Sequence, residues 1–429
     1  MIATLRLFAC FSIVAAGMVF AAEKTNTRDG ALPVTTHPVR TGAQILADNG
    51  FAMLAGRRVG LIANHTARVG TDHLADLLHA APNVTLVALF GPEHGVRGTA
   101  DASESVPHDR DDKTGVPVYS LYGKTRQPTK AMLKGIDVLI FDIQDIGARF
   151  YTFISTMGLA MQAAAAARIP FIVLDRPNPL GGNYVAGFSV VRSNISFVSQ
   201  YPVPLAHGLT VGELARMIRG EKLLPGLQHL ELDVVEMTGW GREMQWPDTG
   251  LAWVPTSPNI PEFETALVYP GTGLFEATAA SEGRGTNQPF RLLGAAWTDG
   301  AALADTLNTR ALPGARFEPA TFTPRRLTGM AADPKARDKK ISGVRVVVTD
   351  ARTYLPVETG VHILHAFRAQ ARKAGRPFIN RPDWLAKLAG RRKLNGMLRR
   401  GDRPAQIIAA WRKAVDDFRR KRMAYLLYE

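Results

Sequence analysis

The sequence predicts an α/β protein built on a doubly wound, mostly parallel β-sheet. Short β-branched apolar runs alternate with helix-length segments, and turn-forming residues such as Gly, Pro and Asn follow the apolar runs. The chain has 429 residues, of which 46% are hydrophobic, so it can bury more than one core. These observations indicate a globular protein of two or three domains.

Four strands and two helices carry this pattern. The strands are expected at 58–64, 84–90, 137–144 and 169–175. Helices are expected at 72–81 and at 152–168, where the second contains an alanine run. Because helices separate strands, the strands should run parallel. The polar segment 95–128 contains scattered Gly and Pro residues and fits a long active-site loop.

The pattern weakens after Gly187, where several Pro-rich loops follow. One clear later strand is expected at 343–350, and helices are expected from there to the end. We therefore expect a domain boundary near 265, with one domain at 41–265 and another at 266–429.

The first 22 residues have the features of a cleavable secretory signal. Arg6 precedes an apolar run of about a dozen residues, and small residues lie near Ala21 and Ala22. An uncleaved membrane anchor is the alternative, but the run is short for a span. Residues 23–40 are rich in Thr and Pro and should form a flexible leader. The mature protein should therefore be exported, periplasmic or secreted, without stable membrane insertion.

Cysteine content agrees with export. The single cysteine, Cys10, lies inside the apolar run and would be lost with the signal. A mature chain without thiols has no disulfide framework, no catalytic cysteine and no thiolate metal site.

Positive charge is concentrated near the C-terminus. The formal net charge is +14, and residues 366–429 hold 18 basic and 5 acidic residues. This region could contact an anionic envelope polymer, a membrane surface or nucleic acid. Apolar residues at spacings of three and four favour instead a helix docked on the protein. They are Ile408, Trp411, Val415 and Phe418. The chain has no recognisable nucleic-acid module, so nucleic acid is not expected as a partner.

The run VTLVALFGPEHG, residues 84–95, ends an apolar strand in a tight turn that presents Glu93 and His94. In an open α/β sheet, ligands bind beyond the carboxyl ends of the strands. A proline and two glycines around one carboxylate indicate a backbone that holds an acid in a cleft. A purely structural turn is the alternative.

Polar side chains follow all four strand ends and could converge at one edge of the sheet. Most of them are hydrogen-bonding groups, which suits a polar, hydroxyl-rich ligand such as a sugar. Asp142 and Asp145 could instead cap the following helix. Arg149 and Arg176 could be internal ion-pair partners, although an acidic substrate would need such donors. The candidates are Asn64, Glu93, His94, Asp142, Gln144, Asp145, Arg149, Tyr151, Arg176 and Asn178.

A second acidic cluster lies in residues 269–290. Glu276 and Glu282 flank a stretch of small residues, and Arg284 sits between two glycines. Glu282 could be a solvated loop acid. If the loop folds over the sheet edge, Glu282 would face Glu93, and two carboxylates across a glycosidic bond are what glycoside hydrolysis requires.

Other classes of site have little support. Metal-binding residue types occur near the strand ends, but none shows HExxH or a comparable spacing, so no metal is expected. The sequence contains no GxxxxGK[ST] motif, no GxGxxG after the first strand and no GxSxG. We expect no cofactor.

Several motifs in order resemble the NamZ-type exo-β-N-acetylmuramidases, formerly a family of unknown function. They are GPEHG, DIQDIGARFYTF, DRPNPLGG, PTSPNIP, YPGTGLFE, SEGRGT and the closing YLLY. The resemblance covers roughly residues 41–429. It implies a Rossmann-like catalytic domain joined to a smaller α+β ancillary domain, with the site between them. It also implies release of N-acetylmuramic acid from non-reducing ends of peptidoglycan fragments, with the catalytic glutamate at Glu93.

Residues and resemblance together give one hypothesis. Glu93 acts as general acid, and Glu282 or another carboxylate such as Asp142 assists as base or nucleophile. Arginines recognise the lactyl carboxylate that distinguishes muramic acid from N-acetylglucosamine. The arginine candidates are Arg97, Arg149, Arg176 and Arg284. Asn259, in the PTSPNIP motif, is a further candidate for sugar binding.

Two alternatives stay open at this stage. One is a non-catalytic envelope protein that binds peptidoglycan or another glycan through the same polar cleft. The other is hydrolysis of a different glycoside or ester on the same scaffold. Peptidoglycan fragments are the expected partners whether the protein hydrolyses peptidoglycan or only binds it.

Overall fold

A computed structural model describes Met1 and residues 38–98, 109–123 and 125–429. The predicted signal peptide beyond Met1, and the predicted leader as far as residue 37, lie outside the described residues. The end of that leader is ordered, in contrast to the prediction. Val39 is buried against Met237 and Trp240, because its apolar side chain completes a small separate core.

The larger sheet has seven strands in the order β5-β6-β4-β1-β7-β8-β9. All neighbouring pairs are parallel except β5 and β6, which are antiparallel. The strands are β1 (Arg58–Ala63), β4 (Thr85–Gly91), β5 (Asp109–Arg110), β6 (Pro117–Ser120), β7 (Val138–Asp142), β8 (Phe171–Leu174) and β9 (Leu232–Val235). The prediction of a mostly parallel α/β sheet is confirmed.

Helices cover both faces of this sheet. On one face, α1 (Gly42–Asp48) and α2 (Leu74–Ala80) pack in a core that includes Leu61. On the other face, α3 (Phe153–Ala167) and α4 (Val211–Gly220) pack in a core that includes Ile62. Successive strand residues point to opposite faces, so the apolar runs are buried on both sides, as a parallel sheet requires.

The structure differs from the predicted elements in three places. The short strand β3 (Asp72–His73) occupies the start of the helix expected at 72–81. The expected loop 95–128 contains β5 and β6, which are too short to show an apolar period. Helix α4 was not predicted, although its Thr210 and Glu213 form a capping box, a signal that can be read from sequence.

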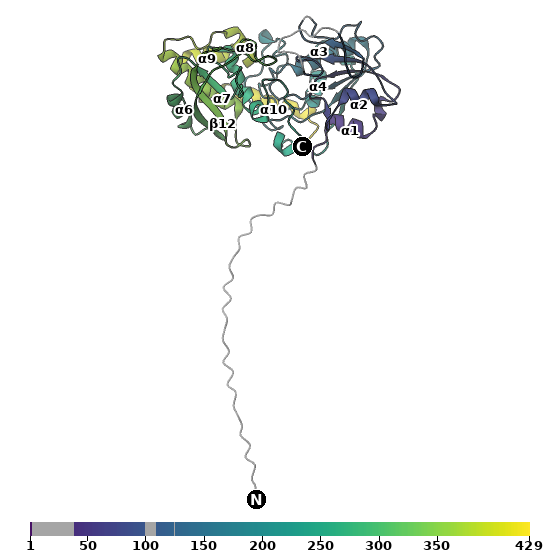
Figure 1. Ribbon diagram of the computed structural model, residues 1–429, viewed down its shortest axis with the longest axis horizontal. Coiled ribbons are helices and arrows are strands. Elements are labelled where there is room, and N and C mark those ends of the chain that lie inside the picture. Colours follow the sequence, from purple (N-terminus) through teal and green to yellow (C-terminus); the bar gives the residue numbers. More distant parts are fainter. Residues whose placement is uncertain (2–37, 99–108, 124) are drawn as a thin grey trace. The chain divides into compact units, whose positions relative to one another are not determined.

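A second, antiparallel sheet follows, in the order β10-β12-β11. Its strands are β10 (Leu292–Ala295), β11 (Ala315–Phe322) and β12 (Ile341–Val348), and the last agrees with the strand expected at 343–350. Figure 1 shows α6–α9 grouped around β12. The helices after the first domain are α5 (Phe263–Thr272), α6 (Gly300–Asn308), α7 (Pro356–Lys373), α8 (Pro382–Ala389), α9 (Lys393–Arg400) and α10 (Pro404–Arg422).

Helix α10 is docked by its apolar stripe. Trp411, Val415 and Phe418 are buried, and the Trp411 ring meets Phe188 edge-on at 5.3 Å between centroids. The apolar stripe includes Ile407, which is buried, in place of the predicted Ile408. Its basic side chains other than Arg422 are exposed, so the docked-helix interpretation is confirmed. Within the described residues, no helix has both the length and the apolar character needed to cross a membrane.

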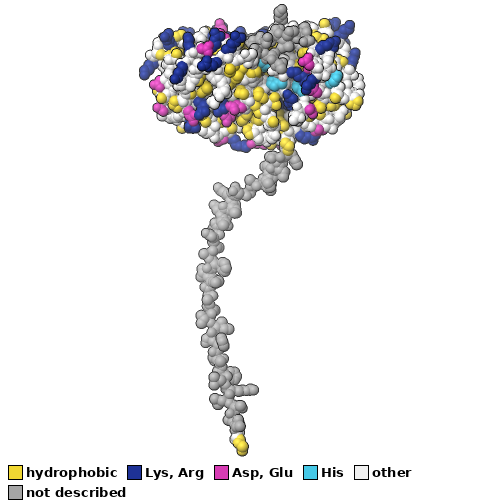
Figure 2. Space-filling model, viewed as in Figure 1, with side chains coloured by type: hydrophobic (Ala, Val, Ile, Leu, Met, Phe, Trp, Pro, Cys, Tyr) yellow, Lys and Arg dark blue, Asp and Glu magenta, His cyan; other side chains and the backbone are white. Residues whose placement is uncertain are grey.

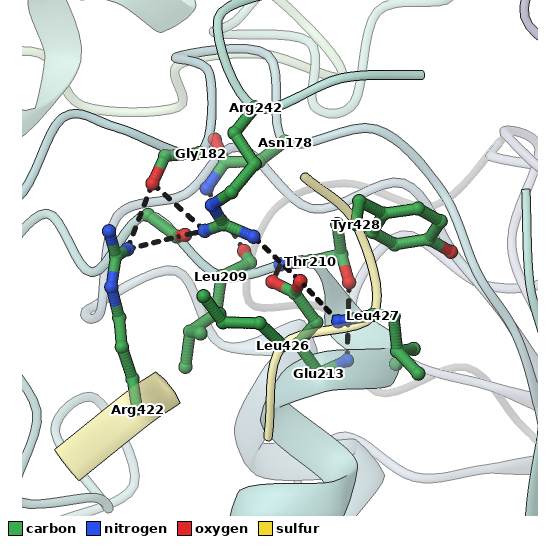
Figure 3. Close-up of polar contacts among 12 residues, drawn as sticks. Asn178, Gly182, Leu209, Thr210, Glu213, Arg242, Arg422, Leu426, Leu427 and Tyr428 are labelled. Carbon is green, nitrogen blue, oxygen red and sulfur yellow. Dashed lines mark hydrogen bonds and ion pairs between the residues drawn. The ribbon is translucent and has the colours of Figure 1, made fainter. Parts of the chain in front are cut away.

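The last residue of α10 and the segment after it bond residues of the first domain (Figure 3). Arg422 donates to the carbonyls of Gly182 and Gly208, both at 2.8 Å. The Leu427 amide donates to Glu213 at 3.0 Å. Tyr428 donates its hydroxyl to Asp175 at 2.6 Å. Residues 422–428 therefore complete the polar interior of the first domain.

Because Asp175 is buried where residues 422–428 attach, the stability of the folded protein should depend on pH. Burial raises the pKa of Asp175 to about 7, although hydrogen bonds from Tyr428 and Gly212 oppose the shift. When folding raises the pKa of a carboxyl group, that group stabilises the folded protein fully at pH values below its ordinary pKa of 3.8. This stabilisation is lost as the pH rises towards 7. In denaturant unfolding, the stability advantage of wild type over Asp175→Asn should shrink between pH 4 and pH 7. Asp233→Asn, on the exposed side of β9, should show no such trend, and a constant advantage of Asp175 would contradict this account.

Candidate active site

A cavity of about 580 Å³ lies at the carboxyl end of β4 and is closed by segments of the second domain. This volume is typical of small-molecule sites, which span about 300–1,000 Å³. Glu93 and His94 line it from the β4 turn, and Glu276 and Glu282 line it from the segment that follows α5. The folded chain thus brings the two predicted acidic regions into one cavity.

A strained turn presents Glu93. Directly after β4, the Gly95 amide donates to the Pro92 carbonyl at 3.0 Å, which closes the turn. His94 and Gly95 both have left-handed backbone conformations, with φ of 73° and 74°. For a residue with a side chain such as His94, that conformation costs on the order of 1 kcal/mol or more. The surrounding fold therefore holds Glu93 in place at the cavity.

Glu282 is buried, with 4% of its surface exposed, and does not project into solvent as a loop acid would. Lys335 Nζ lies 2.9 Å from Glu282 Oε2, without the angle of a hydrogen bond, and Arg284 Nε lies 3.7 Å from Oε1. Arg284 also donates to Glu276 at 3.0 Å. Burial alone would lower the pKa of Arg284, but the two glutamates more than offset this and raise it.

Glu93 differs from these two glutamates. Glu276 and Glu282 are both in ion pairs, whereas no described cation lies within ion-pair distance of Glu93. Lys335 is held by the carbonyls of Phe275 and Ala280, at 2.7 and 3.2 Å, as well as by Glu282. The cavity therefore contains one carboxyl without a cationic partner and two carboxylates that share cations.

Aromatic side chains form much of the wall. Tyr269 packs edge-on against Phe290, with centroids 4.6 Å apart, and against Phe150 at 5.2 Å. Tyr151 bonds Thr256 through its hydroxyl at 2.8 Å, and burial raises the pKa of Tyr151. Of these rings only Tyr151 was predicted as a site residue, because the others come from segments far apart in the chain.

Asn259 lines the same cavity and is 2% exposed. Its Nδ2 donates to the Met330 carbonyl at 2.6 Å, while its Oδ1 has no hydrogen-bond partner within the described part of the chain. A buried acceptor at a cavity can receive a hydroxyl or amide proton from a ligand. Among the described residues, no three His, Cys, Asp or Glu side chains are grouped so that they could hold a metal ion.

Two further side chains at the cavity were not predicted. Arg381 and Trp384 line it from the start of α8, and the Arg381 guanidinium lies 5.2 Å from the centre of the Trp384 ring. Arg381 forms no ion pair with any carboxylate of the described chain. Neither residue follows a strand or shows a catalytic spacing, so only the folded structure connects them with Glu93.

Eight predicted residues do not line this cavity in the described structure. Three of the arginines bond other groups of the chain and do not line the cavity. Arg97 bonds Asp76 and Asp111, at 2.6 and 2.7 Å. Asp142 and Arg176 form a buried ion pair at 2.5 Å, so neither faces the cavity. These three arginine and aspartate contacts hold parts of the chain together away from the cavity.

Arg149 is fully buried and bonds backbone carbonyls. Asp145 accepts from the Gly147 amide at 2.7 Å, and burial raises the pKa of Asp145 to about 7. The other three predicted residues that do not line the cavity form hydrogen bonds with nearby backbone groups, because turns after strands leave amides and carbonyls unpaired. They are Asn64 with Thr66, Gln144 with Pro177, and Asn178 with Leu180 and Leu209.

Comparison with known proteins places both halves of the chain in one family. Residues 59–264 match Exo-beta-N-acetylmuramidase NamZ, N-terminal, and residues 267–428 match Exo-beta-N-acetylmuramidase NamZ, C-terminal. The chain belongs to the NamZ family. A NamZ relative, the peptidoglycan beta-N-acetylmuramidase of Bacillus subtilis (strain 168), is 43% identical over 392 residues, which is 91% of each chain.

Solved structures show the same NamZ fold. One DUF1343 family protein from Bacteroides fragilis NCTC 9343 is 41% identical, with a TM-score of 0.84 over 91% of this chain and 99% of its own. Another from the same organism is 31% identical, with a TM-score of 0.75 over 92% of this chain and 99% of its own. The two-domain α/β architecture is therefore shared across these relatives.

Proposed function

We infer that this NamZ chain is an exo-β-N-acetylmuramidase that releases N-acetylmuramic acid from non-reducing ends of peptidoglycan fragments. The observation that carries this inference is the pairing of Glu93, which has no described cation partner, with the ion-paired Glu282 in one cavity. Membership of the family and the peptidoglycan-directed activity named for the Bacillus subtilis relative support the same substrate.

Glu93 and Glu282 have different roles in this proposal. Glu93 donates its proton to the glycosidic oxygen as the bond from that oxygen to the anomeric carbon breaks. Glu282 is the second carboxylate, which attacks the anomeric carbon or takes a proton from the attacking water. Water supplies the oxygen of the new hydroxyl, and its remaining proton returns to the carboxyl pair.

The rest of the cavity binds the sugar. The rings of Tyr269, Phe290 and Trp384 offer apolar faces to a pyranose, and the Asn259 Oδ1 accepts from a hydroxyl or the N-acetyl amide. Arg381 recognises the lactyl carboxyl group, a role assigned to other arginines by sequence alone. Arg284 is committed to Glu276 and Glu282, and so it positions the carboxylates.

Paired chromogenic substrates test the proposed function. The protein should cleave a β-N-acetylmuramide much faster than the matching β-N-acetylglucosaminide, which lacks the lactyl group. An arginine contact to a carboxylate contributes on the order of 1.5–3 kcal/mol, so the preference should be roughly tenfold or greater. Equal turnover of both substrates would reject muramyl specificity, and no turnover of either would reject the glycosidase.

Replacing Arg381 should reduce that preference selectively. Arg381→Gln should lower kcat/KM for the muramide by roughly tenfold and leave the glucosaminide unchanged, because only the muramide carries the carboxylate. Lys387→Gln removes an exposed charge from the same helix and should have no effect on either substrate. A variant that lost both activities equally would place Arg381 in a general structural role.

We also propose that residues 1–22 direct export and are then removed, which would place the enzyme in the periplasm or outside the cell, beside its polymeric substrate. N-terminal sequencing of the protein recovered from its native host tests this. A mature chain that began at Met1 would contradict cleavage.

A further inference from the structure

A second cavity, of about 540 Å³, lies between the end of α7 and α9. Figure 2 shows Lys and Arg side chains gathered over the part of the surface where Figure 1 places α8 and α9. We refer to this space as the basic cavity. Four arginines line it: Arg368, Arg372, Arg376 and Arg399.

The arginines of the basic cavity have no acidic partner. In the described part of the chain none of the four forms an ion pair, and Arg368 donates to the backbone carbonyl of Arg399 at 2.8 Å. A neighbouring arginine behaves differently, since Arg392 pairs with Asp383 at 2.7 Å. Guanidinium groups that line one cavity without a carboxylate favour an anionic ligand, and the planar fork of arginine matches a carboxylate.

A short exposed segment separates the basic cavity from the active site. Ile379 and Pro382 line the basic cavity, whereas Arg381 and Trp384 line the active-site cavity. Residues 380–383 are all exposed, so this segment lies at the surface of the protein. A chain of sugars can therefore pass over it from one cavity to the other.

The proposed substrate has the charge pattern that two such cavities require. Arg381 recognises a free lactyl carboxylate, so the terminal muramic residue carries no peptide. In a glycan without peptides, every muramic residue has such a carboxylate, and muramic residues alternate with N-acetylglucosamine. Neighbouring sugars of a β-1,4-linked chain are turned over relative to each other, so successive lactyl groups project from the same side. A second carboxylate therefore follows the first along the side of the glycan that faces Arg381.

We propose that the basic cavity binds the lactyl carboxylate of the second muramic residue of the glycan. This inference rests on the proposed function and extends it to the length of the substrate, because sugars beyond the first disaccharide then contribute to binding. The terminal muramic residue occupies the active-site cavity, the N-acetylglucosamine lies over Pro382, and the next muramic residue reaches Arg372 and Arg399. The bond that is cleaved remains the one next to the terminal residue.

The lining favours a sugar over a phosphate group. Phe378 and Leu398 give the basic cavity an apolar portion, which suits the face of a pyranose. Asn395 also lines it, and its Oδ1 has no hydrogen-bond partner among the residues described. A muramic residue supplies hydroxyl and N-acetyl N–H donors for such an acceptor, whereas a fully ionised phosphate offers only acceptors.

Three peptide-free substrates test the proposal. They are the disaccharide N-acetylmuramyl-N-acetylglucosamine, the tetrasaccharide that repeats it, and a tetrasaccharide in which N-acetylglucosamine replaces the second muramic residue. Wild-type kcat/KM should be roughly tenfold higher for the repeating tetrasaccharide than for the other two, because several exposed arginine contacts each contribute modestly. Arg372→Gln/Arg399→Gln should remove most of this advantage and leave the disaccharide unchanged. Both positions are exposed, so folding should be preserved.

The matched control is Lys373→Gln/Lys393→Gln, which removes the same charge from the same helices at exposed positions outside the cavity lining. It should keep the full preference for the repeating tetrasaccharide. A wild type that cleaves all three substrates equally well, or an equal loss of preference in test and control variants, would overturn the proposal and leave the proposed function standing. Failure to cleave any of the three would instead reject the proposed function.

Calorimetry provides a readout that does not depend on turnover. In the cleavage-deficient Glu93→Gln background, the repeating tetrasaccharide should bind roughly tenfold more tightly than the disaccharide, and the difference should shrink at high salt. Adding Arg372→Gln/Arg399→Gln should abolish the difference. A difference that persists in that variant would place the second muramic residue elsewhere. Tighter binding of tripolyphosphate than of the tetrasaccharide would assign the basic cavity to a phosphate polymer and overturn the proposal.

Discussion

Glu93→Gln should lower kcat on a β-N-acetylmuramide by about 10²–10⁴-fold, the contribution typical of a positioned general acid. The amide keeps the size and the hydrogen-bonding capacity of the side chain but has no proton to give to the leaving oxygen. Because the turn at Pro92 and Gly95 fixes the backbone, the substituted side chain should occupy the same place in the cavity.

Binding and stability should survive this substitution. Calorimetry with N-acetylmuramic acid should give a similar dissociation constant for wild type and Glu93→Gln, and the melting temperature should be unchanged, because Glu93 forms no described ion pair. Glu243→Gln, at an exposed position, serves as the control and should retain full activity. Undiminished turnover in Glu93→Gln would refute the assignment, and a wild type that binds the sugar without cleaving it would indicate a glycan-binding protein.

Arg149→Met should destabilise the fold by about 3–5 kcal/mol, a large part of the 5–15 kcal/mol that typically separates folded from unfolded protein. The Arg149 guanidinium donates to the carbonyls of Phe188, Val203 and Leu388, at 2.6, 2.9 and 2.7 Å. Methionine has similar volume but no donor, and each buried carbonyl left unpaired costs about 1–3 kcal/mol. Denaturant unfolding should show the loss directly.

The contacts of Arg149 also indicate which parts of the protein the substitution should affect. Phe188 and Val203 belong to the first domain, whereas Leu388 belongs to α8 and lines the active-site cavity. Arg149→Lys should recover part of the stability, because an ammonium can still donate to some of these carbonyls. A stable Arg149→Met variant with weakened sugar binding would restore the substrate-binding role expected from sequence.

The larger sheet and the position of Glu93 could be predicted from the sequence because their signals are local. The runs that form β1, β4, β7 and β8 are apolar except at a strand end, as strands buried on both faces must be. Glu93 follows one of them directly, in a turn marked by proline and glycine. Strand direction alone then places it at the edge where ligands bind.

The remaining site residues could not be separated from structural ones by residue type. Arg176 and Arg381 are both arginines beside a Pro, yet Arg176 is buried against Asp142 and Arg381 lines the cavity. The difference depends on which carboxylate the fold places beside each guanidinium. That information lies in contacts between residues distant in the chain, such as Glu282 with Lys335.

The anchoring of residues 422–428 links the order of synthesis to the order of folding. Asp175 precedes Tyr428 by 253 residues, and Glu213 precedes Leu427 by 214. While the ribosome is still translating the antiparallel domain, these carboxylates have yet to meet their partners. These contacts of the Rossmann-like domain therefore form only after translation has ended, and a fragment stopped at the domain boundary would leave Asp175 and Glu213 without those partners.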